Sequence, residues 1–393
     1  MDRESTGLPD QMTMSQMTMS QMSEHRVRSL AILAAGTVIP AMPLVLDEHR
    51  RFNEKGQRRL IRYYLSAGAG GLAVAVHTTQ FEIRLPEIGL FETVLEVAAD
   101  EIKRFEERTD RTVVRVAGVC GPAGQAVREA GLAARLGYDA ALLSPGGLNG
   151  FSEDDLVDRT KQVTGIMPVI GFYLQPAVGG RIFTFDYWQR ICAVEGVVAI
   201  KCASFNRYLT LDVMRAVALS SRSERIAMYT GNDDNIFADL MTEYAVEQDG
   251  HIFRSRFVGG LLGHWAVWTH TAVRLFGQLK AARQGSPASE AELDWLTLAA
   301  QVTDSNSAIF DAANQFKGCI TGIHEVLRRQ GLLAGIWTLN PDEKLSPEQY
   351  QEIDRVYRQY PHLNDDAFVR DFLAGEQNRP AQSDPDNPET PDK

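Results

Sequence analysis

Lys201 is the residue whose surroundings most favour covalent chemistry. It lies inside residues 197–204, a short apolar run typical of a strand buried on both faces. Burial disfavours the charged ammonium group and lowers the pKa of a lysine, and the neutral amine is a nucleophile. Considered alone, however, a lysine near a strand end is more often a surface cation with a buried stem.

Tyr173 precedes Lys201 by 28 positions and ends a second apolar run, residues 168–176. One helix-sized segment separates the two runs, so in a parallel βαβ unit the strands would be neighbours. Both side chains would then lie near the carboxyl ends of their strands. A tyrosine is neutral at pH 7 and can donate or accept a proton, although a strand tyrosine is usually core. Together, the two residues suggest carbonyl chemistry through a Schiff base.

Composition indicates a soluble globular protein. The chain has 393 residues, 44% of them hydrophobic, and a formal net charge of -11. An excess of acidic residues argues against nucleic acid or an anionic membrane as partner, because both attract clustered Lys and Arg. No apolar run approaches the ~20 residues that span a bilayer. The four cysteines are far apart and form no CxxC pair, as expected for reduced thiols in the cytoplasm.

A strand-and-helix pattern repeats eight times before residue 285. The expected strands are 37–46, 71–77, 113–119, 140–146, 168–175, 197–204, 225–231 and 257–263. An amphipathic helix follows each, the seventh over 234–248 and the eighth over 265–284. Eight βα units predict a (β/α)8 TIM barrel, for which about 250 residues is typical. A doubly wound open sheet is the alternative, disfavoured because no glycine-rich phosphate loop follows the first strand.

Four segments are expected along the chain. Residues 1–25, which repeat QMTMS, predict a disordered leader, and residues 26–285 predict the barrel. After the barrel the pattern becomes helical alone, so residues 286–375 predict a C-terminal helical region. Residues 376–393 are rich in Pro, Asp, Asn and Glu and predict a disordered tail.

Active sites of such barrels are built at the carboxyl ends of the strands. That rule selects the candidates His77, Thr78, Thr79, Gly146, Gly147, Tyr173, Lys201, Gly231, Asn232, Asp233, Gly259 and Gly260. Each has an ordinary structural explanation when taken singly, because threonines cap helices and glycines turn corners. Their coincidence at one rim of one barrel favours a site.

The order of motifs at this rim resembles that of the dihydrodipicolinate synthase and N-acetylneuraminate lyase family of pyruvate-type aldolases. The motifs are HTT, FYLQP, AIKCAS, GNDD and GG, within about residues 37–360, where the family typically shows GTTGE, YNxPxRTG and GIKxxxG. The resemblance implies a (β/α)8 barrel, often a homotetramer, in which Lys201 forms a Schiff base with a 2-oxo acid. It further implies that Tyr173 relays protons and that Thr78 and Thr79 bind the carboxylate of the pyruvyl group.

Departures from the family pattern concern the second substrate. Gly147 lies in a Pro-Gly-Gly run where synthases have a tyrosine-containing run. Val178 occupies the place of the arginine that grips the second carboxylate, and Arg181 is displaced by three positions. We therefore expect loss of aspartate semialdehyde binding. His77 replaces the first glycine of GTTGE and either contacts a substrate hydroxyl, transfers protons or fills space.

The sequence predicts a Schiff-base lyase, either an aldolase or a dehydratase, acting on a 2-oxo acid such as pyruvate or a 2-keto-3-deoxy sugar acid. The alternative is a weakened barrel that binds a small oxo acid without turnover. Asn232 and Gly260 join His77, Gly147 and the threonines as expected substrate contacts. We expect no cofactor and no metal, because no second ligand accompanies His77 at metal-binding spacing. A homo-oligomer, tetramer or dimer, is expected.

Overall fold

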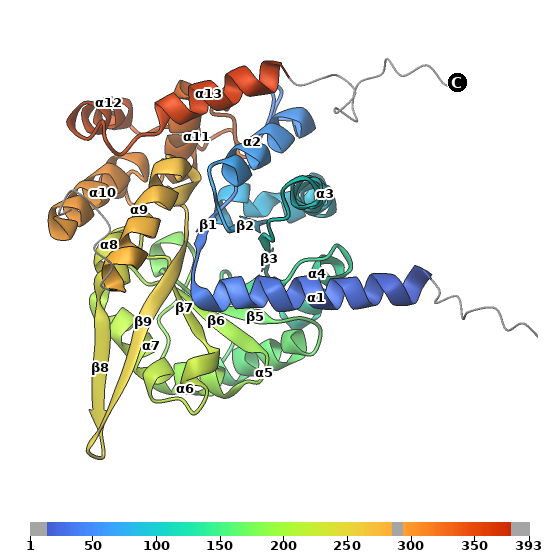
Figure 1. The fold of residues 1–393 in the computed structure, drawn as a ribbon, viewed down its shortest axis with the longest axis vertical. Coiled ribbons are helices and arrows are strands. Elements are labelled where there is room, and N and C mark those ends of the chain that lie inside the picture. Colours follow the sequence, from blue (N-terminus) through green and yellow to red (C-terminus); the bar gives the residue numbers. More distant parts are fainter. Residues whose placement is uncertain (1–13, 285–293, 379–393) are drawn as a thin grey trace, which may run out of the picture.

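Eight parallel strands form a barrel in the computed structural model, which describes residues 14–284 and 294–378 (Figure 1). The strands are β1 (Val38–Pro40), β2 (Gly71–Val74), β3 (Val114–Val119), β4 (Ala140–Leu143), β5 (Val169–Leu174), β6 (Val197–Ala203), β7 (Ala227–Thr230) and β9 (His251–Leu262). They pair in the order β1-β9-β7-β6-β5-β4-β3-β2. A parallel bridge from Ala41 to Ala73 closes the ring. The predicted (β/α)8 barrel is confirmed, and the open sheet is wrong.

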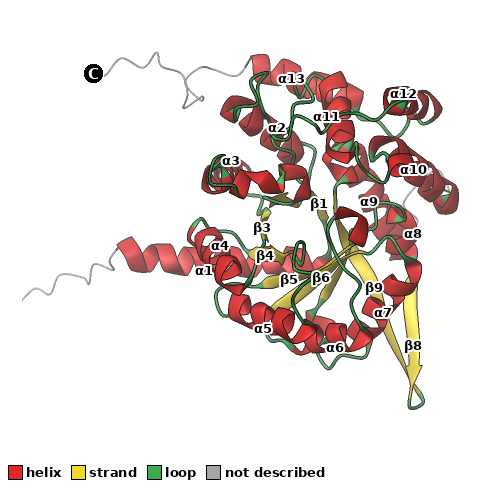
Figure 2. Ribbon diagram, turned by 180° about the vertical axis from the view of Figure 1, so that it is seen from behind, coloured by secondary structure: helices red, strands yellow, loops and turns green. Residues whose placement is uncertain are grey.

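Helices surround the strands (Figure 2). They are α2 (Glu54–Ser66), α3 (Phe91–Thr109), α4 (Ala123–Arg135), α5 (Glu153–Thr164), α6 (Phe185–Ala193), α7 (Arg207–Ala218), α8 (Ile236–Met241) and α9 (Thr269–Arg283). Successive strand side chains point to opposite faces, so each strand feeds two layers of core. In β5, Ile170 and Phe172 join the cluster inside the barrel, whereas Val169 and Tyr173 join the layer under the helices.

The seventh βα unit differs from the prediction of one helix over residues 234–248. Helix α8 ends at Met241, and β8 (Glu243–Gln248) then runs antiparallel to β9. Asp249 and Gly250 join these strands with φ values of 54° and 78°. An Asp-Gly pair with two positive φ angles is the preferred two-residue hairpin turn. The hairpin projects from the barrel (Figure 1). The Asp-Gly turn favours a hairpin here, although the apolar spacing before it is typical of a helix.

Helix α1 (Met14–Ala35) begins inside the segment expected to be a disordered leader. Residues 1–13 lie outside the described residues, and residues 14–25 are part of α1. Because α1 ends just before β1 begins, it lies at the amino-terminal face of the barrel. Leu33 joins the inner core, and its carbonyl accepts a hydrogen bond of 2.8 Å from the Tyr229 hydroxyl. His25 also contacts Glu106 at 2.9 Å.

The C-terminal region is helical, as predicted. It contains α10 (Trp295–Ile309), α11 (Cys319–Arg329), α12 (Gln349–Gln359) and α13 (Asp366–Gln377). Helix α13 extends past residue 375, and the expected tail from residue 379 onward lies outside the described residues. The region is attached to the barrel by contacts such as the hydrogen bond of 2.6 Å from the Tyr63 hydroxyl to Asp365. None of the described helices is long and apolar enough to cross a membrane.

Candidate active site

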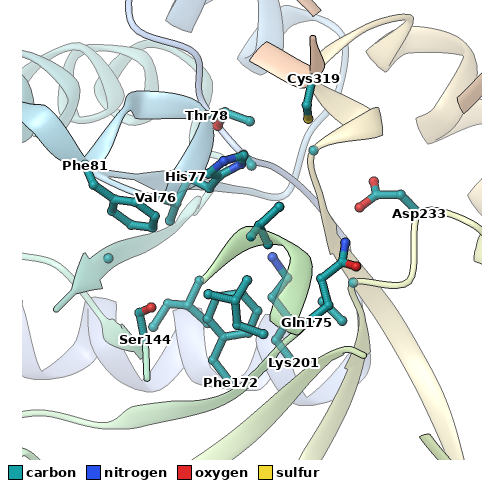
Figure 3. A pocket seen from close by; sticks show the side chains of 18 of the residues that line it. Val76, His77, Thr78, Phe81, Ser144, Phe172, Gln175, Lys201, Asp233 and Cys319 are labelled. Carbon is teal, nitrogen blue, oxygen red and sulfur yellow. The ribbon is translucent and has the colours of Figure 1, made fainter. Parts of the chain in front are cut away.

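A cavity opens at the carboxyl ends of the strands, where the barrel meets the C-terminal helical region (Figure 3). It has about 730 Å³ of space, including the solvent at its mouth. Its polar lining residues are His77, Thr78, Cys120, Ser144, Gln175, Lys201, Asp233 and Cys319. Its larger apolar lining residues are Val76, Phe81, Leu142, Phe172, Leu174, Val178, Phe205, Phe310 and Phe316.

Lys201 reaches this cavity from β6 and is 8% exposed. Burial lowers its pKa to about 8, while the negative charge of Asp233 acts in the opposite direction. Its Nζ lies 4.5 Å from the ring centroid of Phe172. A Cβ atom at Gly231 would overlap Cε of Lys201, so glycine at that position leaves room for the lysine stem. The cavity therefore holds an amine that is partly neutral near pH 7.

Asp233, which follows β7, brings a carboxyl group to the same cavity. Its Oδ1 accepts a hydrogen bond of 2.8 Å from the backbone N–H of His264. Burial raises the pKa of Asp233 to about 7, and the positive charge of Lys201 opposes the shift. The sequence placed Asp233 at the rim but gave it no role. The feature of the sequence that could have indicated a role is its position two residues after Gly231, at a strand end.

His77 lies in a short 3-10 helix, His77–Thr79, and lines the cavity. Burial and the charge of Lys201 lower its pKa to about 4, so its imidazole is neutral at pH 7. The ring lies 5.9 Å from that of Phe81. The described residues contain no group of three His, Cys, Asp or Glu able to hold a metal ion. A neutral imidazole can offer a substrate one hydrogen-bond donor and one acceptor.

The two threonines have different positions. Both hydroxyls donate to the carbonyl of Met42, at 3.1 Å from Thr78 and 2.7 Å from Thr79. The Thr79 hydroxyl also accepts from the backbone N–H of Val76. Thr78 lines the cavity, whereas fully buried Thr79 does not. Of the predicted pair, only Thr78 is placed to contact a bound carboxylate.

Tyr173 was predicted to relay protons, but it does not line the cavity. Its ring packs under the helices against Phe183 and Trp188, with centroids 5.7 and 5.2 Å away. Its hydroxyl accepts a hydrogen bond of 3.4 Å from the Phe183 N–H. Phe172, next in the strand, pairs with Lys201 in register and faces inward. A shift of one residue in a strand exchanges its two faces, and β5 has a register irregularity at Val169.

Replacing Tyr173 with phenylalanine is therefore expected to leave kcat within about twofold of the original value. Loss of one buried hydrogen bond should lower the free energy of unfolding by about 0.5–1.5 kcal/mol. Phe172→Leu is the matched variant, because it changes the ring that lies against Lys201. Steady-state kinetics and thermal unfolding measure both effects. A fall in kcat of two orders of magnitude or more for Tyr173→Phe would instead support the predicted role of Tyr173 as a proton relay.

Three other residues predicted to contact the substrate make contacts within the protein. Gly147 turns a corner with φ +74°, and its N–H donates to the Gly179 carbonyl. A Cβ atom at Gly260 would lie 2.6 Å from the Trp265 ring. The Asn232 side chain is fully buried and accepts from the Phe205 N–H at 3.0 Å. None of the three predicted residues lines the cavity.

Val178 lines the cavity, as its place in the sequence suggests, but Arg181 does not. The Arg181 guanidinium donates a hydrogen bond of 2.6 Å to the Phe151 carbonyl and lies over the ring of Phe183. No arginine is among the described residues that line the cavity. A second carboxylate would find no guanidinium there.

A sequence profile of the Dihydrodipicolinate synthetase family matches residues 34–245, more than half of the chain. The chain belongs to this family. The N-acetylneuraminate lyase of Fusobacterium nucleatum is similar in structure, with a TM-score of 0.63 and 18% identity over 83% of this chain and 99% of that one. The dihydrodipicolinate synthase of Oceanobacillus iheyensis has a TM-score of 0.65 and 16% identity over 86% and 99%. No curated protein matches the chain.

Membership of the dihydrodipicolinate synthetase family supports a pyruvate-dependent, aldolase-type lyase in general terms. Because these solved structures are so low in sequence identity to this chain, their similarity supports the fold alone. The family resemblance seen in the sequence is confirmed.

Proposed function

We propose that this protein is a lyase that forms a Schiff base between Lys201 and a 2-oxo acid. One observation carries the proposal: a buried amine with a pKa of about 8 lines a cavity at the carboxyl ends of the barrel strands. About a tenth of such an amine is neutral at pH 7, far more than of an ordinary lysine. The solved structure of the E. coli K12 protein YagE, a similar fold, holds pyruvate.

The chemistry begins when the neutral amine attacks the C2 carbonyl and water leaves, giving an iminium ion. This ion accepts the electron pair of the C3–C4 bond as the bond breaks, and an enamine forms. In an aldol cleavage the 4-hydroxyl loses its proton as the aldehyde departs. Protonation at C3 and addition of water then release pyruvate and restore Lys201. Dehydration shares the first intermediate, so the amine does not separate the two reactions.

Asp233 is proposed as the group that carries the proton. Its carboxyl group lines the cavity with Lys201, and each changes the pKa of the other. A group with a pKa near 7 takes up and returns a proton most effectively at neutral pH. Thr78 and neutral His77 are proposed to hold the 2-oxo acid by hydrogen bonds, which would fix its carbonyl toward the amine.

The substrate is proposed to differ from that of a true dihydrodipicolinate synthase. Such a synthase must hold a second carboxylate, and a bidentate arginine is the strong way to do so. Val178 presents an alkyl group to the cavity, and Arg181 contacts Phe151 instead. A charged group left unpaired costs at least ~1–3 kcal/mol. A coupled assay with pyruvate and aspartate semialdehyde should show little or no condensation.

Borohydride trapping tests the proposed function. Protein treated with pyruvate and borohydride should gain the mass of one reduced pyruvyl group, read by intact mass. Enamine formation should also exchange the C3 hydrogens of pyruvate with deuterium from heavy water, read by NMR. Absence of both signals would contradict the proposal.

The rate of adduct formation should depend on pH as the Lys201 amine titrates. Only the neutral amine attacks, so the rate should rise about tenfold per pH unit below pH 8 and level off above it. If Lys201 had the ordinary lysine pKa of 10.5, the rate would keep rising with pH up to about that value. Initial rates between pH 6 and 10 measure the midpoint. A midpoint above about 10 would contradict the buried state of Lys201.

The alternative, a barrel that binds an oxo acid without turnover, is favoured by the outward position of Tyr173. It predicts a borohydride adduct without C3 exchange. The two measurements therefore distinguish the two functions.

A further inference from the structure

Aromatic side chains from distant parts of the chain meet in the cavity. Phe81 follows β2, Phe205 follows β6, and Phe310 and Phe316 come from the C-terminal helical region. The rings of Phe205 and Phe316 pack edge to face, with centroids 5.5 Å apart and an interplanar angle of 76°. Such an arrangement is favourable for aromatic rings and leaves ring faces and edges for a further planar group.

The backbone at this aromatic pair is held in an unusual conformation. Phe205 and Phe316 have φ values of +51° and +65°, which residues other than glycine seldom adopt. The N–H of Phe205 donates to buried Asn232 at 3.0 Å, and that of Phe316 donates to the Asp311 carbonyl at 3.0 Å. Strained residues persist where the surrounding structure fixes them, often at ligand sites. The fold therefore holds both rings at the cavity against their backbone preference.

Phe310 enters the cavity because residue 263 is glycine. A Cβ atom at Gly263 would lie 2.7 Å from Cζ of the Phe310 ring. Beyond Lys201, Asp233, His77 and Thr78, the other polar side chains of the lining are Cys120, Ser144, Gln175 and Cys319, and the larger apolar side chains outnumber them. A polyhydroxylated or doubly charged substrate would leave buried polar groups unpaired there, which is costly.

We propose that the substrate carries a flat apolar group beyond C3 and that the aldehyde released or consumed is an aryl aldehyde. This inference rests on the proposed Schiff-base function. A 4-aryl-4-hydroxy-2-oxobutanoate would lose the C3–C4 bond, with its electrons passing to the iminium ion and the hydroxyl proton to Asp233. The proton then returns to C3, and water adds to the iminium carbon and cleaves its bond to Lys201, so that one aryl aldehyde and one pyruvate leave.

Competitive borohydride trapping tests this substrate class without requiring turnover. The intact protein is offered equal concentrations of pyruvate, 2-oxoglutarate and 2-oxo-4-phenylbutanoate, and the three adducts are separated by mass. We expect the phenyl adduct to exceed the 2-oxoglutarate adduct by about tenfold or more. A pyruvate adduct with equal or greater trapping of 2-oxoglutarate would overturn the aryl preference alone. No adduct with any of the three would overturn the Schiff base itself.

Variants of the aromatic wall locate the preference. Phe316→Leu should reduce the ratio of the phenyl adduct to the pyruvate adduct about fivefold, because it removes one ring of the pair. Phe253→Leu, on the exposed hairpin, is the matched control and should leave this ratio unchanged. Thermal unfolding shows whether each variant is folded. A folded Phe316→Leu variant with an unchanged preference would overturn the assignment of this wall as the aryl site.

Discussion

Replacing Lys201 with alanine should abolish the pyruvyl adduct and lower turnover by roughly three orders of magnitude or more. In the proposed mechanism this amine forms the covalent bond, and the iminium ion made from it is the electron sink. The folded protein holds Lys201 with a lowered pKa, so keeping its charged form buried costs stability at pH 7. The alanine variant does not bear this cost. The gain should offset part of the decrease in the free energy of unfolding that follows from losing the packed lysine stem. Intact mass after borohydride treatment and a thermal unfolding curve measure the two effects.

Lys161→Ala is the control for this experiment, because Lys161 is exposed and paired with Asp158 on α5. It should keep the full adduct. A specific adduct that persists in the Lys201→Ala variant at the original rate would show that another amine reacts.

Replacing Asp233 with asparagine should slow C3 exchange and cleavage by about two to four orders of magnitude, the usual contribution of a positioned acid or base. Asparagine can still accept the hydrogen bond from the His264 N–H, so the loop should keep its shape. The negative charge of Asp233 raises the pKa of Lys201. Removing it should lower that pKa further, so the adduct should form at least as fast at pH 7. Exchange and trapping, measured on one sample, separate proton transfer from amine attack.

Asp234→Asn is the matched control, since Asp234 is the next residue, pairs with Arg207 at 3.6 Å and does not line the cavity. It should keep normal exchange. If Asp233→Asn exchanges C3 hydrogens at the original rate, Asp233 only supports the His264 loop, and another group moves the proton.

The amino-acid sequence by itself determined the barrel and singled out Lys201 as the proposed nucleophile. Strand and helix periods are local properties, so eight βα repeats could be read without tertiary information. Lys201 could be identified because it lies inside an apolar run. A charged side chain is costly to bury, whichever elements that run packs against. The acid–base candidate Asp233 could be placed at a strand end, but the sequence did not show that it is buried in the same cavity as Lys201.

Tertiary structure decided which side chains line the cavity. Tyr173 and Phe172 are neighbours in one strand, and a register shift of one residue decides which of them lies inside the barrel. Asn232 supports the backbone of Phe205 only because the loops after β6 and β7 lie side by side. Phe205 meets Phe316 across 111 positions of sequence, a contact set by packing of the C-terminal region on the barrel. Local patterns carry no information on such contacts, because register and long-range packing are fixed only when the whole core forms.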